Sequence, residues 1–323
     1  MTLQEIKAPV EGHVTAFEKL FRETMKSKVP LLDKITQYIV RRKGKQIRPL
    51  FVFFSAGIFG NITDRTYRAA SLIELLHTAT LIHDDVVDDS NERRGFFSLN
   101  ALWKNKISVL VGDYLLSRGL LLSLEHDDFD LLKIVSNSVK EMSEGELMQI
   151  EKARNLDIDE AIYFEIIRKK TASLIASCMA CGAASLHVTE KDVALMYEVG
   201  EKAGIAFQIK DDILDFETSA DKGKPSGTDI KEKKMTLPLI YVINQASYRD
   251  RRRIINTVKN HSQDPEKVAE LMEMVHDQGG IEYAHDYMQL YKDQAIELLL
   301  SLPDVPARES LRNLVEYVVQ RKT

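Results

Sequence analysis

The sequence predicts an all-α fold, built as a single domain of many helices over residues 1–323, and three observations carry this prediction. Glycine and proline are scarce: 15 and 8 of 323 residues make about 7 % of the chain, where ordinary usage gives roughly 12 %. Apolar residues recur at helical spacing almost throughout, and the alternation typical of strands is nearly absent. No segment rich in Pro, Gly or Ser divides the chain into two parts.

The helical pattern can be followed from one end of the chain to the other. Examples are Phe17, Leu20 and Phe21; Leu31, Leu32, Ile35 and Ile39; and Leu195, Met196 and Val199. The apolar run 50–54 continues through Ser55, Ala56 and Ile58, which favours a helix starting after Pro49. Interruptions are expected at Gly44, Gly60, Gly95, 221–227, Gly279-Gly280 and 303–306.

Composition excludes several classes of protein. A net charge of -5 offers no basic surface for nucleic acid, and 44 % hydrophobic residues exclude general disorder. Cys178 and Cys181 are too few for a disulfide framework, and the N-terminal residues lack the apolar core of a signal peptide, so a cytoplasmic protein is expected. The uncharged run 171–189 is long enough to span a bilayer, but its small residues favour a helix buried in a soluble core.

The most informative segment extends from His77 to Gly95 and holds five carboxylates within nine residues. At about 100° per residue, His77, Asp84 and Asp88 share one helix face, so the two aspartates can hold one hard cation together. Like charges at this spacing destabilise a helix, and something must offset their repulsion. Mg²⁺, which prefers oxygen ligands, fits this need. The alternative is a solvated acidic helix end.

A second cluster, Asp211-Asp212-Ile-Leu-Asp215, repeats the same spacing 127 residues later, again at the end of an apolar helical run. Two such faces across a cavity would bind a polyphosphate through bridging Mg²⁺, because carboxylates and phosphates repel one another without metal. An amphipathic surface stripe is the alternative for this cluster alone, and its pairing with the first cluster disfavours that interpretation.

Basic residues accompany both clusters. Five of them surround Gly44, where donors could converge on a small polyanion, although a solvated helix end would look the same: Arg41, Arg42, Lys43, Lys45 and Arg48. Arg93 and Arg94 follow the first cluster, and Lys169-Lys170-Thr171 begin the small-residue helix. A glycine-bearing loop with Lys222, Lys224, Lys231, Lys233 and Lys234 could close over a bound anion and exclude water.

These segments resemble the ordered motifs of the trans-isoprenyl diphosphate synthases. The similarity runs from about Lys43 to Tyr241 and rests on GKQIRP, HTATLIHDDVVDDSNERRG, VLVGDYLLSRG, KKTASLI, FQIKDDILDF and GKPSGTDIKEKKMTLPLIY. The likeness is greatest to the long-chain, all-trans polyprenyl diphosphate synthases, such as octaprenyl diphosphate synthase. One box departs from the family: the usual Gly-Gly-Lys-Arg reads Lys43-Gly44-Lys45-Gln46 here.

The resemblance implies an isoprenoid synthase fold around a deep central cavity, a homodimer, and a role for each matching residue. Mg²⁺ would be held by Asp84, Asp88 and Asp211, with Asp215 in the same metal set and Asp85 and Asp212 in support. Isopentenyl diphosphate would be bound by Lys45, Arg48, His77 and Arg94, and the allylic diphosphate by Arg93, Lys170, Lys224 and Lys234. Thr171 and Gln208 would direct oxygen dipoles at the developing cation.

Product length depends on the residues about one turn before Asp84, which are Ala79 and Thr80. The family places large aromatic residues there in short-chain enzymes, so small ones predict elongation to roughly six to eight isoprene units (about C30–C40, octaprenyl as the best estimate) from farnesyl or geranylgeranyl diphosphate. Because such a product is very hydrophobic, the enzyme could associate loosely with membranes without having a membrane span.

Three alternatives to this function stay open. The first is a short-chain farnesyl or geranylgeranyl diphosphate synthase. A non-catalytic regulatory subunit of a heteromeric synthase would usually lack one aspartate cluster, whereas a terpene cyclase would not need Lys45, Arg48 and His77. Elsewhere, Cys178 and Cys181 are interpreted as packing residues, and His83 as a packed or hydrogen-bonding neighbour of Asp84.

Overall fold

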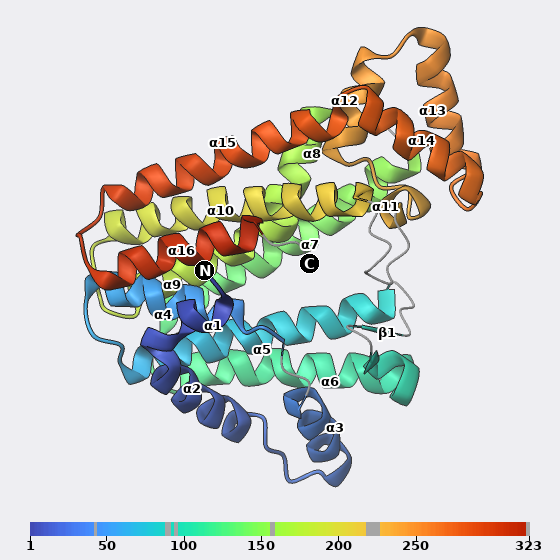
Figure 1. The fold of residues 1–323 in the computed structure, drawn as a ribbon. Coiled ribbons are helices and arrows are strands. Elements are labelled where there is room, and N and C mark those ends of the chain that lie inside the picture. Colours follow the sequence, from blue (N-terminus) through green and yellow to red (C-terminus); the bar gives the residue numbers. More distant parts are fainter. Residues whose placement is uncertain (42–43, 88–91, 94–95, 156–158, 218–226, 321–323) are drawn as a thin grey trace. The chain divides into compact units, whose positions relative to one another are not determined.

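The fold is described from a computed structural model, which confirms the predicted all-α class. Residues 1–41, 44–87, 92–93, 96–155, 159–217 and 227–320 are described, without the side chains of residues 92, 93, 154 and 155. Contacts group the chain into two units: unit 1 (residues 1–139, 177–197 and 302–311) and unit 2 (residues 140–176, 198–301 and 312–323). Figure 1 labels the helices and colours the chain along its sequence.

The first half of the chain contains α1 (Leu3–Lys7), the 3₁₀ turn η1 (Ala8–Val10), α2 (Glu11–Thr24), α3 (Pro30–Arg41), α4 (Ile47–Phe59), α5 (Asp64–Val87), α6 (Leu99–Leu124) and α7 (Phe129–Asn155). Two-residue strands β1 (Glu92–Arg93) and β2 (Phe96–Phe97) pair antiparallel, with Glu92 opposite Phe97. Helix α4 begins at Ile47, before Pro49 rather than after it as predicted, because proline is tolerated in a first helical turn where no N–H is needed.

The second half contains α8 (Glu160–Ile167), the π-helical turn η2 (Arg168–Ala172), α9 (Ser173–Ala184), α10 (Glu190–Phe216), α11 (Thr228–Lys231), α12 (Leu237–Gln245), α13 (Tyr248–Asn260), α14 (Pro265–Asp277), α15 (Gly280–Leu300) and α16 (Pro306–Gln320). The uncharged run 171–189 covers the end of η2, all of α9 and the turn that follows, and the apolar side chains of α9 are buried as predicted.

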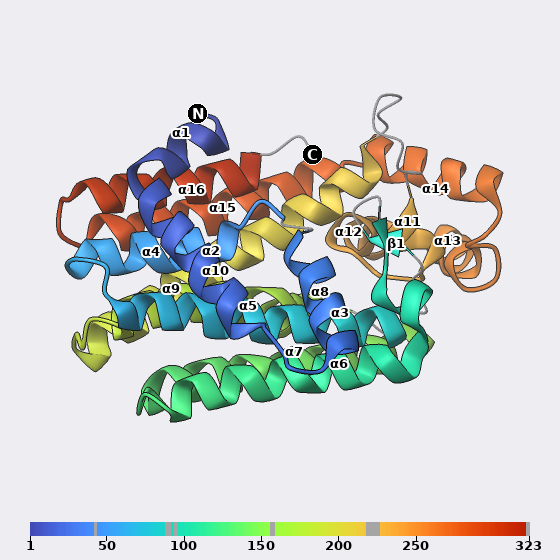
Figure 2. The ribbon, with the colours of Figure 1, turned by 90° about the horizontal axis from the view of Figure 1, so that it is seen from below.

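Unit 1 is built around α4 and α5. Residues 50–54 of α4 are almost fully buried, and α2 crosses both helices, as Figure 2 shows from below. Helix α6 lies along α5 over most of its length. The Ser55 hydroxyl donates to the carbonyl of Met179, 2.5 Å away, which fixes α4 against the part of α9 that belongs to this unit.

A buried ion-pair network holds the N-terminal end of α5. Asp128, at 3 % exposure, accepts hydrogen bonds from Arg65 Nε at 2.9 Å and from Arg68 Nε at 2.6 Å. Burial opposes ionisation of Asp128, but the hydrogen bonds and charges of the two guanidinium groups outweigh it and lower the pKa of the carboxyl group. Arg65 also contacts Asp130 and the carbonyl of Ala184. This network therefore joins α5 to the α6–α7 turn and to the end of α9.

In unit 2, aromatic rings join α8 to α12 and α15. The ring of Tyr241 stacks on Tyr283 at 4.2 Å between centroids, and Phe164 contacts both Tyr287 and Tyr291. The Tyr283 hydroxyl donates to the Glu160 carboxylate at 2.9 Å. Aromatic pairs of this kind stabilise a fold by more than the burial of their surface area alone. They hold α8 in place ahead of the π-helical turn that follows it.

Glycines bring α10 of unit 2 into backbone contact with the helix that follows α8. A Cβ at Gly204 would lie 2.5 Å from the Cα of Ala172, and one at Gly200 would lie 2.6 Å from the Cα of Ala176. A Cβ at Gly145 of α7 would lie 2.9 Å from the amide nitrogen of Lys170. These atoms are backbone and cannot yield, so only glycine permits this packing.

We expect Gly204→Ala to destabilise unit 2 by about 1–3 kcal/mol, because the added methyl group must push two helix backbones apart. Thermal or urea unfolding measures the loss. Gly12→Ala is the matched control, since a Cβ at Gly12 of α2 meets nothing within 4 Å, and alanine there should be neutral or stabilising by up to about 1 kcal/mol. Equal stability of the two variants would contradict the close-packing argument.

Candidate functional site

The first aspartate motif lies at the C-terminal end of α5, in unit 1. His77 and Asp85 are buried at 7 % and 5 % exposure, and Asp84 is half-buried. Apolar residues precede them on α5, which brings carboxylates to the end of a buried helix as the sequence predicted. Asp88, the second predicted ligand of this motif, lies outside the described residues.

His83 packs against α6, as predicted. Its Nε2 atom lies 3.4 Å from the carbonyl oxygen of Val109 and 3.4 Å from the carboxylate of Asp113. The imidazole ring occupies the space where a Cβ of Gly112 would be, so Gly112 makes room for it. His83 therefore holds α5 and α6 together beside the motif.

The structure describes some of the predicted basic residues and not others. Lys45 is exposed, and Arg48 is half-buried in the first turn of α4. Between them Gln46 has a left-handed backbone, with φ 55° and ψ 36°, a conformation uncommon for a residue other than glycine. The structure describes β1 but not the side chain of Arg93, and Arg94 and Lys224 lie outside the described residues.

The second aspartate motif lies in the last turns of α10, in unit 2, where its three carboxylates have different surroundings. Asp211 is exposed, Asp215 is half-buried, and Asp212 is buried at 4 % exposure. Asp212 accepts a hydrogen bond from the hydroxyl of Tyr163 at 2.7 Å and another from Nε2 of Gln208 at 2.8 Å. Tyr163, on α8, has no place among the sequence predictions.

Gln208 and Thr171, both predicted catalytic residues, are brought together. The hydroxyl of Thr171 donates to Oε1 of Gln208 at 2.7 Å. Thr171 lies on the π-helical turn η2, a feature often found at functional sites, and Gly204, one turn before Gln208, brings the two backbones close enough for this bond. Lys170, on the same turn, contacts Glu146 and donates to Gln149 at 3.2 Å.

Asp215 holds the start of α11. Its carboxylate oxygens accept the backbone N–H groups of Thr228, at 3.1 Å, and of Asp229, at 2.9 Å. A carboxylate at a helix N-terminus satisfies backbone donors that have no partner within the helix. Asp215 thereby joins the second motif to the segment that carries Lys234.

Asp229 adds a further carboxylate next to the second motif, and it too was missed from the sequence. It lies 3.5 Å from the ammonium group of Lys234, which also contacts Glu232. Burial raises the pKa of Asp229 to about 6, against the attraction of Lys234. Although burial opposes it, the bond with Glu232 and the charge of Asp229 raise the pKa of Lys234. Lys234 is therefore a cation within the predicted allylic diphosphate region.

The donor set fits a divalent metal by its chemistry. Within the described part of the chain, no group of three His, Cys, Asp or Glu side chains is already arranged to hold an ion. Asp84, which is half-buried, and Asp211, which is exposed, nonetheless place carboxylate oxygens near the ends of their helices. Such oxygens are the ligands that Mg²⁺ and Ca²⁺ prefer.

Two further features carry no such chemistry. Cys178 and Cys181 are fully buried free thiols, and burial raises the pKa of Cys178 to about 12, so packing is confirmed as their role.

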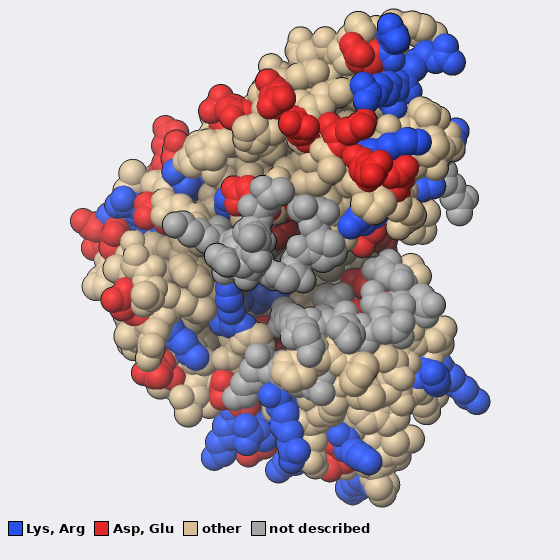
Figure 3. Space-filling model, turned by 45° about the vertical axis from the view of Figure 1, so that its right-hand side comes forward, with Lys and Arg blue, Asp and Glu red and all other residues tan. Residues whose placement is uncertain are grey.

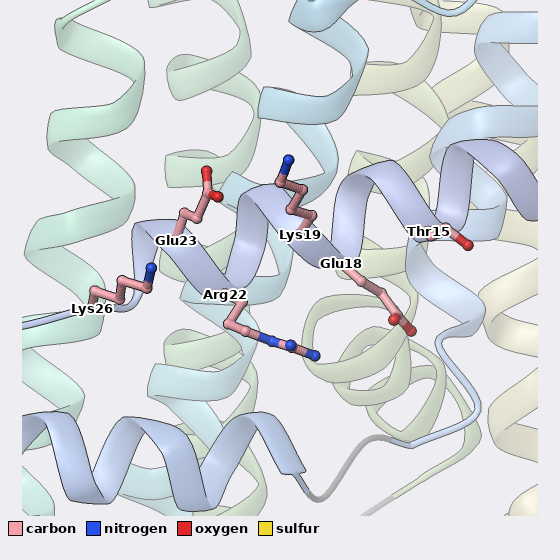
Figure 4. A pocket seen from close by; sticks show the side chains of 6 residues that line it. All are labelled: Thr15, Glu18, Lys19, Arg22, Glu23 and Lys26. Carbon is pink, nitrogen blue, oxygen red and sulfur yellow. The ribbon is translucent and has the colours of Figure 1, made fainter.

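A surface pocket of about 320 Å³ lies along α2 (Figure 4). It is lined by Thr15 and by charged residues of both signs: Glu18, Lys19, Arg22, Glu23 and Lys26. Its exposed, mutually compensating charges resemble ordinary solvated surface.

Comparison with known proteins identifies the family. The Polyprenyl synthetase family model matches residues 29–275. The chain belongs to this family. It is 32 % identical to octaprenyl diphosphate synthase of Escherichia coli strain K12, over 99 % of both chains. The predicted family and its prenyl-transferring class of enzyme are thereby confirmed.

Solved structures agree on the fold. The crystal structure of a decaprenyl diphosphate synthase from Rhodobacter capsulatus is similar at a TM-score of 0.94 and 34 % identity, covering 100 % of each chain. A polyprenyl synthase from Caulobacter crescentus, complexed with calcium and isoprenyl diphosphate, reaches 0.91 at 30 % identity and covers 100 % of this chain and 98 % of its own. A geranylgeranyl pyrophosphate synthase from Bacteroides thetaiotaomicron reaches 0.84 at 39 %, covering 98 % and 99 %. The family is one of divalent-metal-dependent prenyl synthases.

We expect the stability of the metal-free protein to fall as pH rises. Burial, with the charge of Asp229, raises the pKa of Asp212 from 3.8 to about 8. The native state therefore keeps a proton that the unfolded chain has lost, and each pH step above the unfolded pKa favours unfolding. The melting temperature in EDTA should decline from about pH 4 to pH 8, and Asp212→Asn should flatten this decline.

Thermal unfolding at a series of pH values measures the effect. Asp286→Asn replaces an exposed carboxylate of the same unit and should leave the wild-type slope unchanged. An Asp212→Asn protein with the wild-type slope would show that this carboxyl group titrates normally.

Proposed function

We propose that the chain elongates an allylic diphosphate by successive head-to-tail 1'-4 condensations with isopentenyl diphosphate, releasing diphosphate and forming an all-trans polyprenyl diphosphate. The observation that carries this proposal is the hydrogen-bonded pair of Thr171 and Gln208, held beside the second aspartate motif by buried Asp212. It places two side-chain oxygens next to the carboxylates. Such an arrangement suits a reaction that passes through a carbocation.

In this proposal the metal is Mg²⁺, held by Asp84, Asp88, Asp211 and Asp215, with Asp85 and Asp212 in support. When bound, Mg²⁺ neutralises charge on the diphosphate leaving group. Lys45, Arg48, His77 and Arg94 bind isopentenyl diphosphate, while Arg93, Lys170, Lys224 and Lys234 bind the allylic diphosphate. Lys234, whose raised pKa keeps it charged, supports this assignment.

Each protein group then has a physical task. Cationic side chains stabilise negative charge that appears on the diphosphate as the allylic C–O bond breaks. Thr171 and Gln208 face positive charge on the allylic carbon with oxygen lone pairs. Binding both substrates in one place makes attack by the double bond effectively unimolecular. The departing diphosphate is the base that takes the final proton, so no side-chain nucleophile is needed.

Product length is proposed to be long, about C30–C40 with octaprenyl as the best estimate, and the structure separates the two residues assigned to it. Thr80 is half-buried and about 40° from Asp84 around α5, whereas Ala79 is about 140° away. Ala79, at 1 % exposure, packs in a buried cluster with Leu75 and Ile82. Thr80 is therefore the better position at which to test the floor of the cavity.

We expect the wild-type protein to convert farnesyl or geranylgeranyl diphosphate, with excess isopentenyl diphosphate and Mg²⁺, into products of roughly six to eight isoprene units, and Thr80→Phe to shorten them. Chromatography of the dephosphorylated products measures both. Wild-type products that stop at fifteen or twenty carbons would favour a short-chain farnesyl or geranylgeranyl synthase.

Three further experiments test the metal assignment and the two remaining alternatives, a regulatory subunit and a terpene cyclase. The double variant Asp84→Ala with Asp211→Ala should abolish turnover and leave helicity intact; full activity would overturn the metal assignment. A wild-type protein without activity alone, but active on addition of a second subunit, would be a component of a heteromeric synthase. Products formed from the allylic substrate without isopentenyl diphosphate would indicate a terpene cyclase.

The chain is also proposed to form a homodimer through α6. This helix is long and apolar enough to cross a membrane by composition, yet only 39 % of its most apolar window is buried. Its exposed face carries Leu102, Val109, Leu110, Leu120, Leu121 and Leu124. An exposed apolar patch of this kind marks an interaction surface, and a second copy of the same chain can cover it symmetrically.

We expect Leu110→Glu with Leu121→Glu to convert the dimer to a monomer, because the two residues share one face of α6, three turns apart, and would bury charge in the interface. Sedimentation velocity measures the change. The matched control, Leu290→Glu with Leu300→Glu, places the same charges at exposed positions of α15 and should leave the dimer intact. A dimer that survives the α6 changes would place the interface elsewhere.

Location follows from the same proposal. We propose a single functional domain in the cytoplasm, without a membrane span and without a nucleic-acid partner, that associates loosely with membranes when it carries its long product. Lys and Arg side chains gather over the end of unit 2 that contains α13 (Figure 3). Exposed Arg249, Arg251, Arg252 and Lys259 of α13 could add electrostatic attraction to anionic lipid.

A further inference from the structure

Four side chains of unit 2 form a continuous chain of hydrogen bonds. The hydroxyl of Tyr163 donates to Oδ2 of Asp212 at 2.7 Å, and Nε2 of Gln208 donates to Oδ1 of the same carboxylate at 2.8 Å. Oε1 of Gln208 accepts from the hydroxyl of Thr171 at 2.7 Å. The two ends of this chain, Tyr163 and Thr171, lie on α8 and on the π-helical turn that follows it.

The direction of each bond fixes the orientation of the next group. Because Asp212 accepts from the amide nitrogen of Gln208, the amide oxygen of Gln208 must point toward Thr171. Thr171 donates its only hydroxyl proton to that oxygen, so its own lone pairs remain available for a cation. An amide turned the other way would set its oxygen against the Asp212 carboxylate and lose that bond, and its N–H donors would occupy the lone pairs of the Thr171 hydroxyl.

Tyr163 is placed to hold Asp212 and little else. The tyrosine side chain is buried at 3 % exposure, with its ring packed edge-on against Phe164 at 5.3 Å between centroids. Both oxygens of a buried carboxyl group need hydrogen-bond partners, and Tyr163 supplies the one that Gln208 does not. Without it, Asp212 could rotate to seek another partner, and Gln208 would lose its fixed acceptor.

We propose that Tyr163 is a positioning residue for prenyl transfer: through Asp212 it holds the Gln208 amide in the one orientation that directs the oxygens of Gln208 and Thr171 at the developing carbocation. This inference rests on the proposed function of Thr171 and Gln208. It also gives Asp212 an internal role, as the acceptor that joins tyrosine to glutamine.

The test is Tyr163→Phe, which removes the hydroxyl and keeps the ring, measured on the first condensation in a single turnover so that slow product release does not hide the effect. We expect the single-turnover rate to fall roughly tenfold or more, and the KM values of both substrates, measured separately in the steady state, to stay within about twofold, because the lost interaction acts in the transition state. In a Gln208→Ala background the same change should alter the rate by less than about twofold, since the group that Tyr163 positions is gone.

The matched control is Tyr241→Phe, which removes a hydroxyl from another tyrosine of unit 2, stacked on Tyr283, and should leave the rate unchanged. Should Tyr163→Phe fail to fold, Asp212→Asn takes its place: an amide there cannot accept at both oxygens, so the same loss of rate at unchanged KM is expected.

An unchanged rate in Tyr163→Phe, or an equal loss in the wild-type and Gln208→Ala backgrounds, would overturn the inference while the proposed function stands. A wild-type protein that performs no condensation would instead overturn the proposed function.

Discussion

A carboxylate buried in a protein must be hydrogen-bonded, and the arrangement of unit 2 follows from meeting that need at Asp212. At 4 % exposure, Asp212 depends on donors from two different helices, Tyr163 from α8 and Gln208 from its own helix α10. The positions of those donors fix the distance between the helices. Because Gln208 also accepts from Thr171, the same constraint extends to the π-helical turn.

Such short bonds need helices that approach more closely than side chains normally permit. Gly204 and Gly200 of α10 provide this approach against Ala172 and Ala176, and Gly145 of α7 provides it against the turn that carries Lys170. Glycine costs a helix roughly 1 kcal/mol relative to alanine, so three glycines within helices must be offset by the packing that they allow. The chain is poor in glycine, yet these three lie where the proposed catalytic side chains are positioned.

Helical periodicity was enough to predict most of the fold and both aspartate motifs, because that information is local in sequence. Asp84 and Asp211 fall at the ends of apolar helices, where the pattern placed them. Tyr163 could not be found in this way: its partner Asp212 is 49 residues away, and the π-helical turn that carries Thr171 changes the helical phase in a manner that composition does not indicate. Asp229 was not predicted from the sequence for a different reason, since its burial depends on the short helix that Asp215 caps. The proposed chain-length residues Ala79 and Thr80 show a related limit. Both lie about one turn before Asp84 in sequence, but only Thr80 lies on nearly the same side of the helix as Asp84.

Without a bound cation, the carboxylates of unit 2 lower the stability of the fold. With a bound cation, they could help to bind a diphosphate. Raised pKa values of Asp212 and Asp229 record burial, each worsened by neighbouring carboxylates, with Lys234 opposing the shift at Asp229. Asp215 accepts backbone N–H groups with its oxygens and so draws α11, Asp229 and Lys234 toward the same place. A cation bound at Asp211 would relieve this repulsion and invert the local preference for protonation. A diphosphate, which the bare carboxylates would repel, could then bind beside Lys234. The negative charge that lowers the stability of the metal-free protein is therefore the physical basis of the affinity that we propose this site has for a cation, and through that cation for a diphosphate.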